Sequence, residues 1–238
     1  MLLCLEPEGA SISVREDAEE TVRQQMIKDT VVMVLDCGGG TVDITIHKLL
    51  CESHERFICE EIVPSSGGSD WGSKFVDRYF EEFLQEFFGD EFEAIYKNNA
   101  MGRLDVLKHF EMLKRKFNPG QDERSRLQLS YLGEGLSAGK LKELVASYNS
   151  SHPPEFELKQ RGSSSLDLPP ALMICFFQTL FENIKSKVEQ LITHVESKSE
   201  ELGFIFMVGG FSESPFLKSE IKKRFENEKV QVLVPRRP

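Results

Sequence analysis

Short apolar runs near both ends of the chain predict the strands of a sheet. Residues 31–35 are continuously aliphatic, which is typical of a strand buried on both faces. Over 42–47 apolar and polar side chains alternate, which predicts a half-buried strand that returns as a hairpin partner. We expect a third strand at 56–63, closed by a loop at 64–69. Two later strands are predicted at 204–208 and 230–234.

Between these runs the hydrophobic period changes from two to 3.6, which predicts helices. The clearest helix begins at Phe75 and ends at Phe88, with aromatic side chains on one stripe and charged residues opposite, so the rings are expected in a core. Further helices are predicted at 104–117, 140–148, 169–197 and 214–227. Short strands are predicted at 124–131 and 156–160, the second inside a loop at 150–165 that is rich in Ser, Pro and Gly. This order of elements predicts an α/β fold with a helical excursion.

Composition narrows the class of protein. The 238 residues are 40% hydrophobic and 29% charged, which is typical of a soluble globular protein with one large domain or two small ones. The 29 basic and 39 acidic residues give a net charge of −10, and without a basic run we expect no nucleic-acid partner. No apolar run approaches the ~18 residues of a membrane span, and the N-terminus lacks the basic flank of a signal peptide.

The cysteines indicate a reducing compartment. There are five, an odd number, and none stands in C-x-x-C spacing, so we expect free thiols and a cytoplasmic location. His47, Cys51, His54 and Cys59 raise the question of a zinc site. Tetrahedral sites usually have paired ligands two to four residues apart, so no metal-ligand cluster is predicted here.

The sharpest local feature is Asp36-Cys37-Gly38-Gly39-Gly40-Thr41-Val42-Asp43. Three glycines directly after a buried strand make a turn whose N–H groups can approach a polyanion without obstruction by Cβ atoms. The Thr41 hydroxyl adds a donor, and the carboxylates of Asp36 and Asp43 are suited to hydrated Mg²⁺ or to orienting a water. The alternative is a plain hairpin whose glycines supply positive φ. Because a hairpin needs fewer glycines and no flanking acids, phosphate binding is favoured.

Two weaker features follow. Gly209-Gly210 stands between a strand and a helix, an arrangement that lets a ligand lie against bare backbone and a helix N-terminus. Glu111, Lys114 and Arg115 have the spacing of one helix face, and by themselves they are typical of a solvated ion-pair surface.

Four motifs occur in one order along the chain: residues 36–43, 67–72, 110–115 and 208–210. Together they resemble the nucleotide-binding domain of the seventy-kilodalton heat-shock chaperones, a branch of the actin-like ATPases. Residues 41–47 and 208–215 are similar to the divergent member-12 branch of that family, and Glu6-Pro7 is similar to the Glu-Pro that precedes the second phosphate loop. The resemblance spans nearly the whole chain.

The resemblance implies an actin-like (ribonuclease H-like) ATPase lobe, with a mixed sheet flanked by helices and an inserted α+β subdomain. The sheet subdomain would comprise 1–65 and 166–238, and the smaller one 66–165. The ligands implied are ATP or ADP and Mg²⁺. Phosphate contacts are implied for Gly38, Gly39, Gly40 and Thr41. Catalytic roles are implied for Asp36, Asp43 and Glu6; the two aspartates would contact the metal through water, and Glu6 would lie near its water shell. Adenosine contacts are implied for Glu111, Lys114, Arg115, Gly209 and Gly210.

The sequence also departs from the family pattern. Phe211 and Glu213 stand where the typical chaperone has a small polar residue and an arginine that stacks on adenine. Neither the first phosphate loop, Asp-x-Gly-Thr-Thr, nor the catalytic lysine of the family occurs, and the sequence stops before the last ATPase helix of the family. We therefore expect a fragment or natural short form that binds nucleotide, with hydrolysis only in a two-lobed domain.

Three classes of function remain open. An ATP- or ADP-binding lobe of a chaperone-like ATPase is favoured, with client proteins or co-chaperones as further partners. A non-enzymatic interaction protein with a degenerate ATPase fold is supported by Glu213 and the absent first loop. A sugar or acetate kinase of the same superfold is less favoured, because the helix with Glu111, Lys114 and Arg115 resembles the chaperones.

Overall fold

The computed structural model of the chain describes residues 9, 14, 17–50 and 59–235. They form two compact units, Met1–Ser73 with Leu180–Pro238 and Lys74–Thr179, called here the sheet unit and the helical unit. Each is described by itself. The subdomain bounds expected from the sequence, 1–65 with 166–238 and 66–165, stay a prediction.

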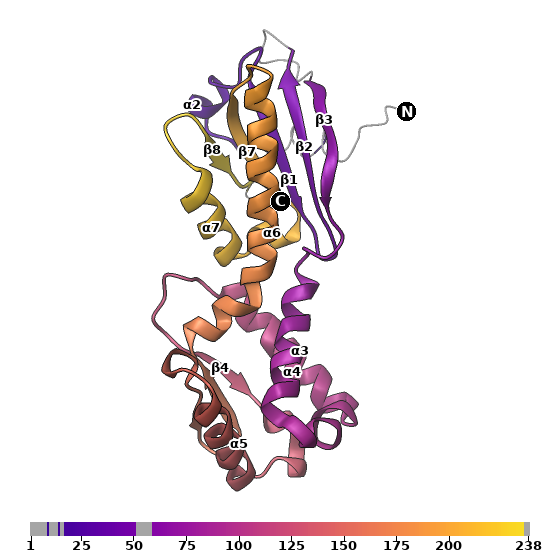
Figure 1. The fold of residues 1–238 in the computed structure, drawn as a ribbon, viewed down its shortest axis with the longest axis vertical. Coiled ribbons are helices and arrows are strands. Elements are labelled where there is room, and N and C mark those ends of the chain that lie inside the picture. The colour runs from indigo at the N-terminus through magenta and orange to yellow at the C-terminus, as the bar shows by residue number, and fades with distance from the viewer. Residues whose placement is uncertain (1–8, 10–13, 15–16, 51–58, 236–238) are drawn as a thin grey trace. The chain divides into compact units, whose positions relative to one another are not determined.

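The sheet unit is built on a five-stranded mixed sheet in the order β3-β2-β1-β7-β8 (Figure 1). Its strands are β1 Val31–Cys37, β2 Val42–Leu49, β3 Cys59–Gly68, β7 Leu202–Val208 and β8 Gln231–Leu233. Strands β1, β2 and β3 form antiparallel pairs, whereas β1 pairs with β7, and β7 with β8, in parallel. The helices of this unit are α2 Glu20–Arg23, α7 Pro215–Phe225 and the second part of α6 Pro170–Ser197. The predicted mixed sheet with flanking helices is confirmed.

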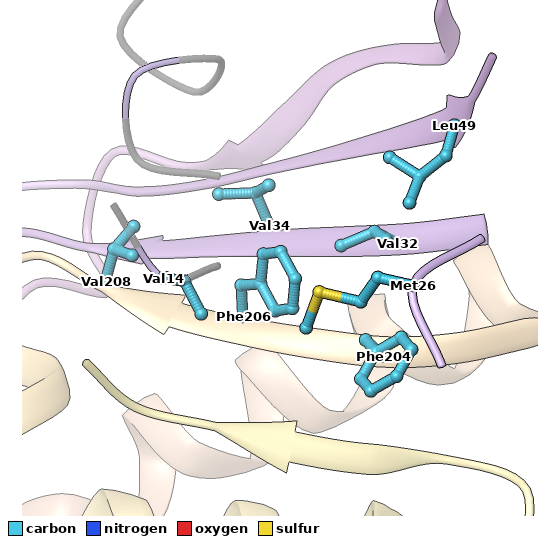
Figure 2. Packing of buried hydrophobic residues seen from close by; sticks show 8 residues of the cluster. All are labelled: Val14, Met26, Val32, Val34, Leu49, Phe204, Phe206 and Val208. Atoms are coloured by element: carbon cyan, nitrogen blue, oxygen red, sulfur yellow. The ribbon is translucent and has the colours of Figure 1, made fainter. Parts of the chain in front are cut away.

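Both faces of β1 and of its parallel neighbour β7 are buried, as their continuous apolar sequences predict. On one face Val32 and Val34 of β1 lie beside Phe204 and Phe206 of β7, and Met26 packs onto them (Figure 2). The alternate side chains, which point to the other face, are also fully buried: Met33, Leu35, Ile205 and Met207. Figure 1 shows α6 and α7 lying over the sheet. Val14 and Met26 pack on the face of Val32, Val34, Phe204 and Phe206, and helices complete the core of this unit (Figure 1).

Two expectations about the hairpin strands are wrong. Strand β2 is not half-buried, since Thr45 and His47 are each 2% exposed and the His47 Nε2 lies 2.9 Å from the Thr45 Oγ1. The predicted loop at 64–69 is mostly strand, because β3 continues to Gly68 and pairs with β2 up to Val42. The pairing of β3 with β2 shifts its register near Ile44 and Ile46, which accommodates the irregular backbone of this stretch. A proline such as Pro64 is tolerated because β3 is an edge strand. The strand predicted at 56–63 is part of β3, and its first residues, 56–58, lie outside the described part of the chain.

The helical unit packs α3 Lys74–Phe88, α4 Ala100–Lys116 and α5 Ala138–Ser151 with the start of α6. The aromatic stripe of α3 is core, as predicted. Phe80 stacks on Phe110 of α4 with ring centroids 3.7 Å apart, and Phe176 of α6 meets both rings edge-on. Short 3-10 or π turns occupy Gly89–Glu91, Glu93–Lys97, Ser130–Gly135 and Pro154–Phe156.

A second sheet, in the order β4-β6-β5, belongs to the same unit. Its strands are β4 Ser125–Gln128, β5 Lys159–Arg161 and β6 Ser165–Leu168. The sequence prediction of one strand at 156–160 within a loop is therefore wrong in part. Pro153-Pro154 begins a 3-10 turn instead, and Gly162, with φ of 60°, turns the chain into β6. The central strand β6 was not predicted from the sequence.

Candidate functional site

The two glycine turns singled out in the sequence leave the sheet at the same edge. Because β1 and β7 are parallel with Asp36 opposite Val208, the turn at 38–40 and the turn at Gly209 both follow the carboxyl ends of neighbouring strands. Open α/β sheets bind ligands at this edge. Gly209 has φ of 79°, and a Cβ there would lie 2.4 Å from the Asp36 Oδ1 and 2.5 Å from the Cys37 carbonyl oxygen. Only glycine fits this contact.

The triple-glycine turn is shaped by close backbone approach. The Gly38 N–H donates to the Thr41 carbonyl at 2.9 Å, and none of the three glycines has positive φ. The alternative interpretation, in which a plain hairpin needs these glycines for a left-handed backbone, therefore does not apply. Instead the following loop packs onto the turn. A Cβ on Gly72 would lie 2.5 Å from backbone atoms of both Gly39 and Gly40, and the Ser73 N–H donates to the Gly38 carbonyl at 3.2 Å.

Two carboxylates flank this turn. Asp36 and Asp43 are directly opposite each other in the β1–β2 pair, so their side chains lie on the same face of the sheet. Asp36 is half-buried, whereas Asp43 is exposed and accepts a hydrogen bond from the Ser65 hydroxyl at 3.5 Å. Carboxylate oxygens match the ligand preferences of Mg²⁺, and a glycine turn beside them lets backbone approach a phosphate closely. Burial, and then the charge of Asp36, raise the pKa of the Cys37 thiol, so this neighbour stays protonated.

The second turn leads into α7. Residues 210–213 form a 3-10 turn in which the Ser212 hydroxyl donates to the Gly209 carbonyl at 2.7 Å. Ser214 then caps α7 by accepting from the Leu217 N–H at 3.5 Å. Phe211 is buried, whereas Glu213 is exposed, so a carboxylate stands on the surface of this turn.

The third predicted group lies on α4 in the helical unit. Lys114 is not part of a solvated surface, since its side chain is 7% exposed. Its Nζ lies 2.8 Å from the Asp77 Oδ1 and 2.5 Å from the Glu111 Oε2, and the Arg115 Nε donates to the Glu111 Oε1 at 2.6 Å. Asp77 was missed as a member of this group because it is on α3, where its spacing only marks the polar side of a helix.

Burial and ion pairing act in opposite directions on the two carboxyls. For Asp77 burial dominates and raises the pKa, although Lys114 opposes it. For Glu111 burial raises the pKa, but the hydrogen bonds and charges of Lys114 and Arg115 together outweigh it, so the pKa falls below its usual value. Glu111 is thus held as a carboxylate between two cations.

The site residues predicted from the sequence therefore belong to different parts of the chain. The sheet unit gathers Asp36, Asp43, Gly38, Gly39, Gly40, Thr41, Gly209 and Gly210 near one edge of its sheet. Glu111, Lys114 and Arg115 belong to the helical unit. Glu6, Cys51 and His54 lie outside the described residues. Within the described part of the chain no cluster of three or more potential metal-ligating His, Cys, Asp or Glu residues occurs, and no helix has the length and apolar character to cross a membrane.

Comparison with known proteins confirms the resemblance to heat-shock 70 kDa proteins, and to their member-12 branch. The chain is 27% identical to Heat shock 70 kDa protein 12A of Mus musculus over 214 residues and 28% identical to Heat shock 70 kDa protein 12B of Homo sapiens over 204 residues. Each similarity covers 85% of this chain and 29% of the relative, so the chain spans less than a third of these relatives. No model of a protein family matches the chain.

Proposed function

We propose that this chain is an ATP- or ADP-binding lobe of a heat-shock-70-like ATPase. The observation that carries the proposal is the packing of glycine backbone at the carboxyl edge of β1 and β7. At Gly72 and Gly209 a Cβ would come within 2.5 Å of backbone or side-chain atoms of the site. Such tightly packed backbone keeps the turn at 38–40 in one shape while leaving Gly39 exposed. The likeness to heat-shock 70 kDa proteins supports a nucleotide as the ligand.

Each residue at this edge has a defined task in the proposal. The Gly38 N–H is already bonded to the Thr41 carbonyl, so in the proposal the turn offers the N–H groups of Gly39 and Gly40 to the β- and γ-phosphates, and exposed Thr41 adds its hydroxyl. Asp36 and Asp43 hold the water shell of Mg²⁺, which neutralises phosphate charge when bound. Gly209 and Gly210 provide bare backbone for the adenosine, and nothing lies within 4 Å of a Cβ built on Gly210. Hydrolysis and chaperone activity are proposed only for a two-lobed domain.

The test is calorimetric titration of the chain with Mg-ADP, with and without excess EDTA. We expect weak binding that needs Mg²⁺, and an affinity at least about tenfold lower, ~1.4 kcal/mol, for Asp36→Asn. The matched control is Glu61→Gln, an exposed acid on β3, which should bind as the unmodified chain does. The absence of heat at millimolar nucleotide from a folded protein would refute the proposal.

A second function, interaction without nucleotide chemistry, is favoured by two observations, one in each unit. Lys114, expected at adenosine, is buried against Asp77 and Glu111. The exposed carboxylate of Glu213 also replaces an arginine expected to stack on the base. If this function is correct, Asp36→Asn and the unmodified chain will behave alike toward Mg-ADP, and both will remain folded.

A further inference from the structure

One face of the small sheet in the helical unit carries an unusual density of cations for a chain with a net charge of −10. Arg126 of β4 and Lys159 of β5 are both opposite Asp167 of the central strand β6, so the three side chains share one face. Arg161, two residues after Lys159, and Arg124, two residues before Arg126, continue the same face. We call Arg124, Arg126, Lys159 and Arg161 the basic face.

The centre of the basic face is a carboxylate held between two arginines. Asp167 is 3% exposed, and its two oxygens accept from the Arg126 Nε at 2.9 Å and the Arg161 Nε at 2.7 Å. The arginine side chains themselves remain 62% and 59% exposed. Asp167 therefore fixes where the two guanidinium groups stand and leaves much of each group open to solvent, a preorganised arrangement for binding anions.

The charges on this face do not cancel. Arg124 and Lys159 both pair with Glu157, at 3.4 Å and 3.3 Å, so four cations share two carboxylates. The cations lie on β4 and β5, on either side of β6, which places their backbones roughly 10 Å apart. Asp167 already accepts from one arginine of each row, so an incoming anion meets only the solvent-exposed parts of the guanidinium groups. In an extended peptide, carboxylates on one side repeat every ~7 Å, which suits such a spread.

We propose that the basic face binds an acidic peptide segment of a partner protein. Charge complementarity supports this choice, because the chain as a whole repels anions and an acidic segment is attracted only where cations are concentrated. Arginine forks already oriented by Asp167 pair with carboxylates at a smaller entropic cost than free side chains. This surface is independent of the proposed nucleotide site, which is in the sheet unit.

The test measures fluorescence anisotropy of fluorescein-labelled hexaglutamate with the full chain, at low and at physiological salt. Labelled hexaglutamine is the neutral probe. The key variant is Lys159→Glu, which leaves both arginines on Asp167 and so preserves the fold. Its matched control is Lys97→Glu, another half-exposed lysine of the helical unit that pairs with a glutamate. Inorganic phosphate and a thymidine oligonucleotide, each at matched ionic strength, serve as competitors.

We expect hexaglutamate to bind, hexaglutamine not to bind, and Lys159→Glu to weaken binding at least about tenfold, a change of ~1.4 kcal/mol. Lys97→Glu should stay within twofold of the unmodified chain, by the same scale about 0.4 kcal/mol. The proposal is overturned by failure of hexaglutamate to bind, by equal effects of the two reversals, or by an oligonucleotide or phosphate that binds where the peptide does not.

Discussion

At the scale of single residues, close packing at glycines fixes the backbone conformation of the candidate site. Gly72 and Gly209 matter because of the atoms that face them, and only Gly209 also requires a positive φ. Spacing in the sequence marked Gly38, Gly39 and Gly40 as a special turn. The motif at 67–72 marked Gly72 as part of the same family pattern, but nothing in the sequence showed that Gly72 packs against that turn, more than thirty residues earlier.

Gly72→Ala should disturb the turn directly. Its Cβ would lie 2.5 Å from backbone atoms of Gly39 and Gly40, so the turn must move, at a cost of about 1–3 kcal/mol in the free energy of unfolding. Chemical denaturation measures this change, and Mg-ADP binding should weaken with it. Gly139→Ala is the control, because its Cβ meets nothing closer than 4.0 Å and lies in helix α5. Equal stability of the two variants would show that the packing at Gly72 is not tight.

At the scale of elements, the Asp167 side chain on β6 links the three strands of the small sheet, because it bonds to Arg126 of β4 and to Arg161 of β5. Burial raises the pKa of Asp167, but the hydrogen bonds and charges of Arg126 and Arg161 outweigh it and hold the pKa below the usual 3.8. A carboxyl with a lowered pKa in the folded protein stabilises the fold above its unfolded pKa, and this stabilisation is lost as the pH falls through the folded value.

Asp167→Asn should therefore destabilise the protein in a pH-dependent way. We expect a loss of about 1–3 kcal/mol at neutral pH, because the amide has no negative charge and keeps only one oxygen to accept from the two arginines. The difference from the unmodified chain should stay constant above about pH 5 and shrink toward zero in stronger acid. Urea denaturation at a series of pH values measures it. A difference that grows below pH ~4 would contradict the ion-pair explanation.

At the scale of the whole molecule, the chain contains two compact units, each with its own sheet and buried core. Helix α6 contributes residues to both, with Phe176 in the aromatic core of the helical unit and Ile184 and Val188 buried in the part assigned to the sheet unit. A boundary inside a continuous helix leaves no mark in the composition of the sequence.

Expression of two fragments tests where the helical unit ends. A fragment of residues 74–179 should fold by itself, because it retains β6 and Phe176. A fragment of residues 66–165 should fail to fold, since it loses the central strand of the β4-β6-β5 sheet and with it the fully buried Leu166 and Leu168. Circular dichroism and thermal melting distinguish them. A cooperative melt of the shorter fragment would favour the boundary predicted from the sequence.

Elements whose hydrophobic patterns are local could be predicted from the amino-acid sequence. The continuous apolar runs of β1 and β7 indicate burial on both faces, and the stripes of α3 and α6 indicate burial on one helix face, so these elements were predicted correctly. The glycine and aspartate motif from Asp36 to Asp43 likewise identified the turn.

Which of these elements contact one another became clear from the three-dimensional fold. Strand β6 has just four residues, and its place between β4 and β5 depends on partners distant in sequence. The ion pair of Lys114 with Asp77 and the packing of Gly72 on the turn are also contacts between separate segments. The pattern around a residue indicates whether it is buried but not which residues bury it. For this reason the sequence suggested residues for a candidate site but not the contacts that bring them together.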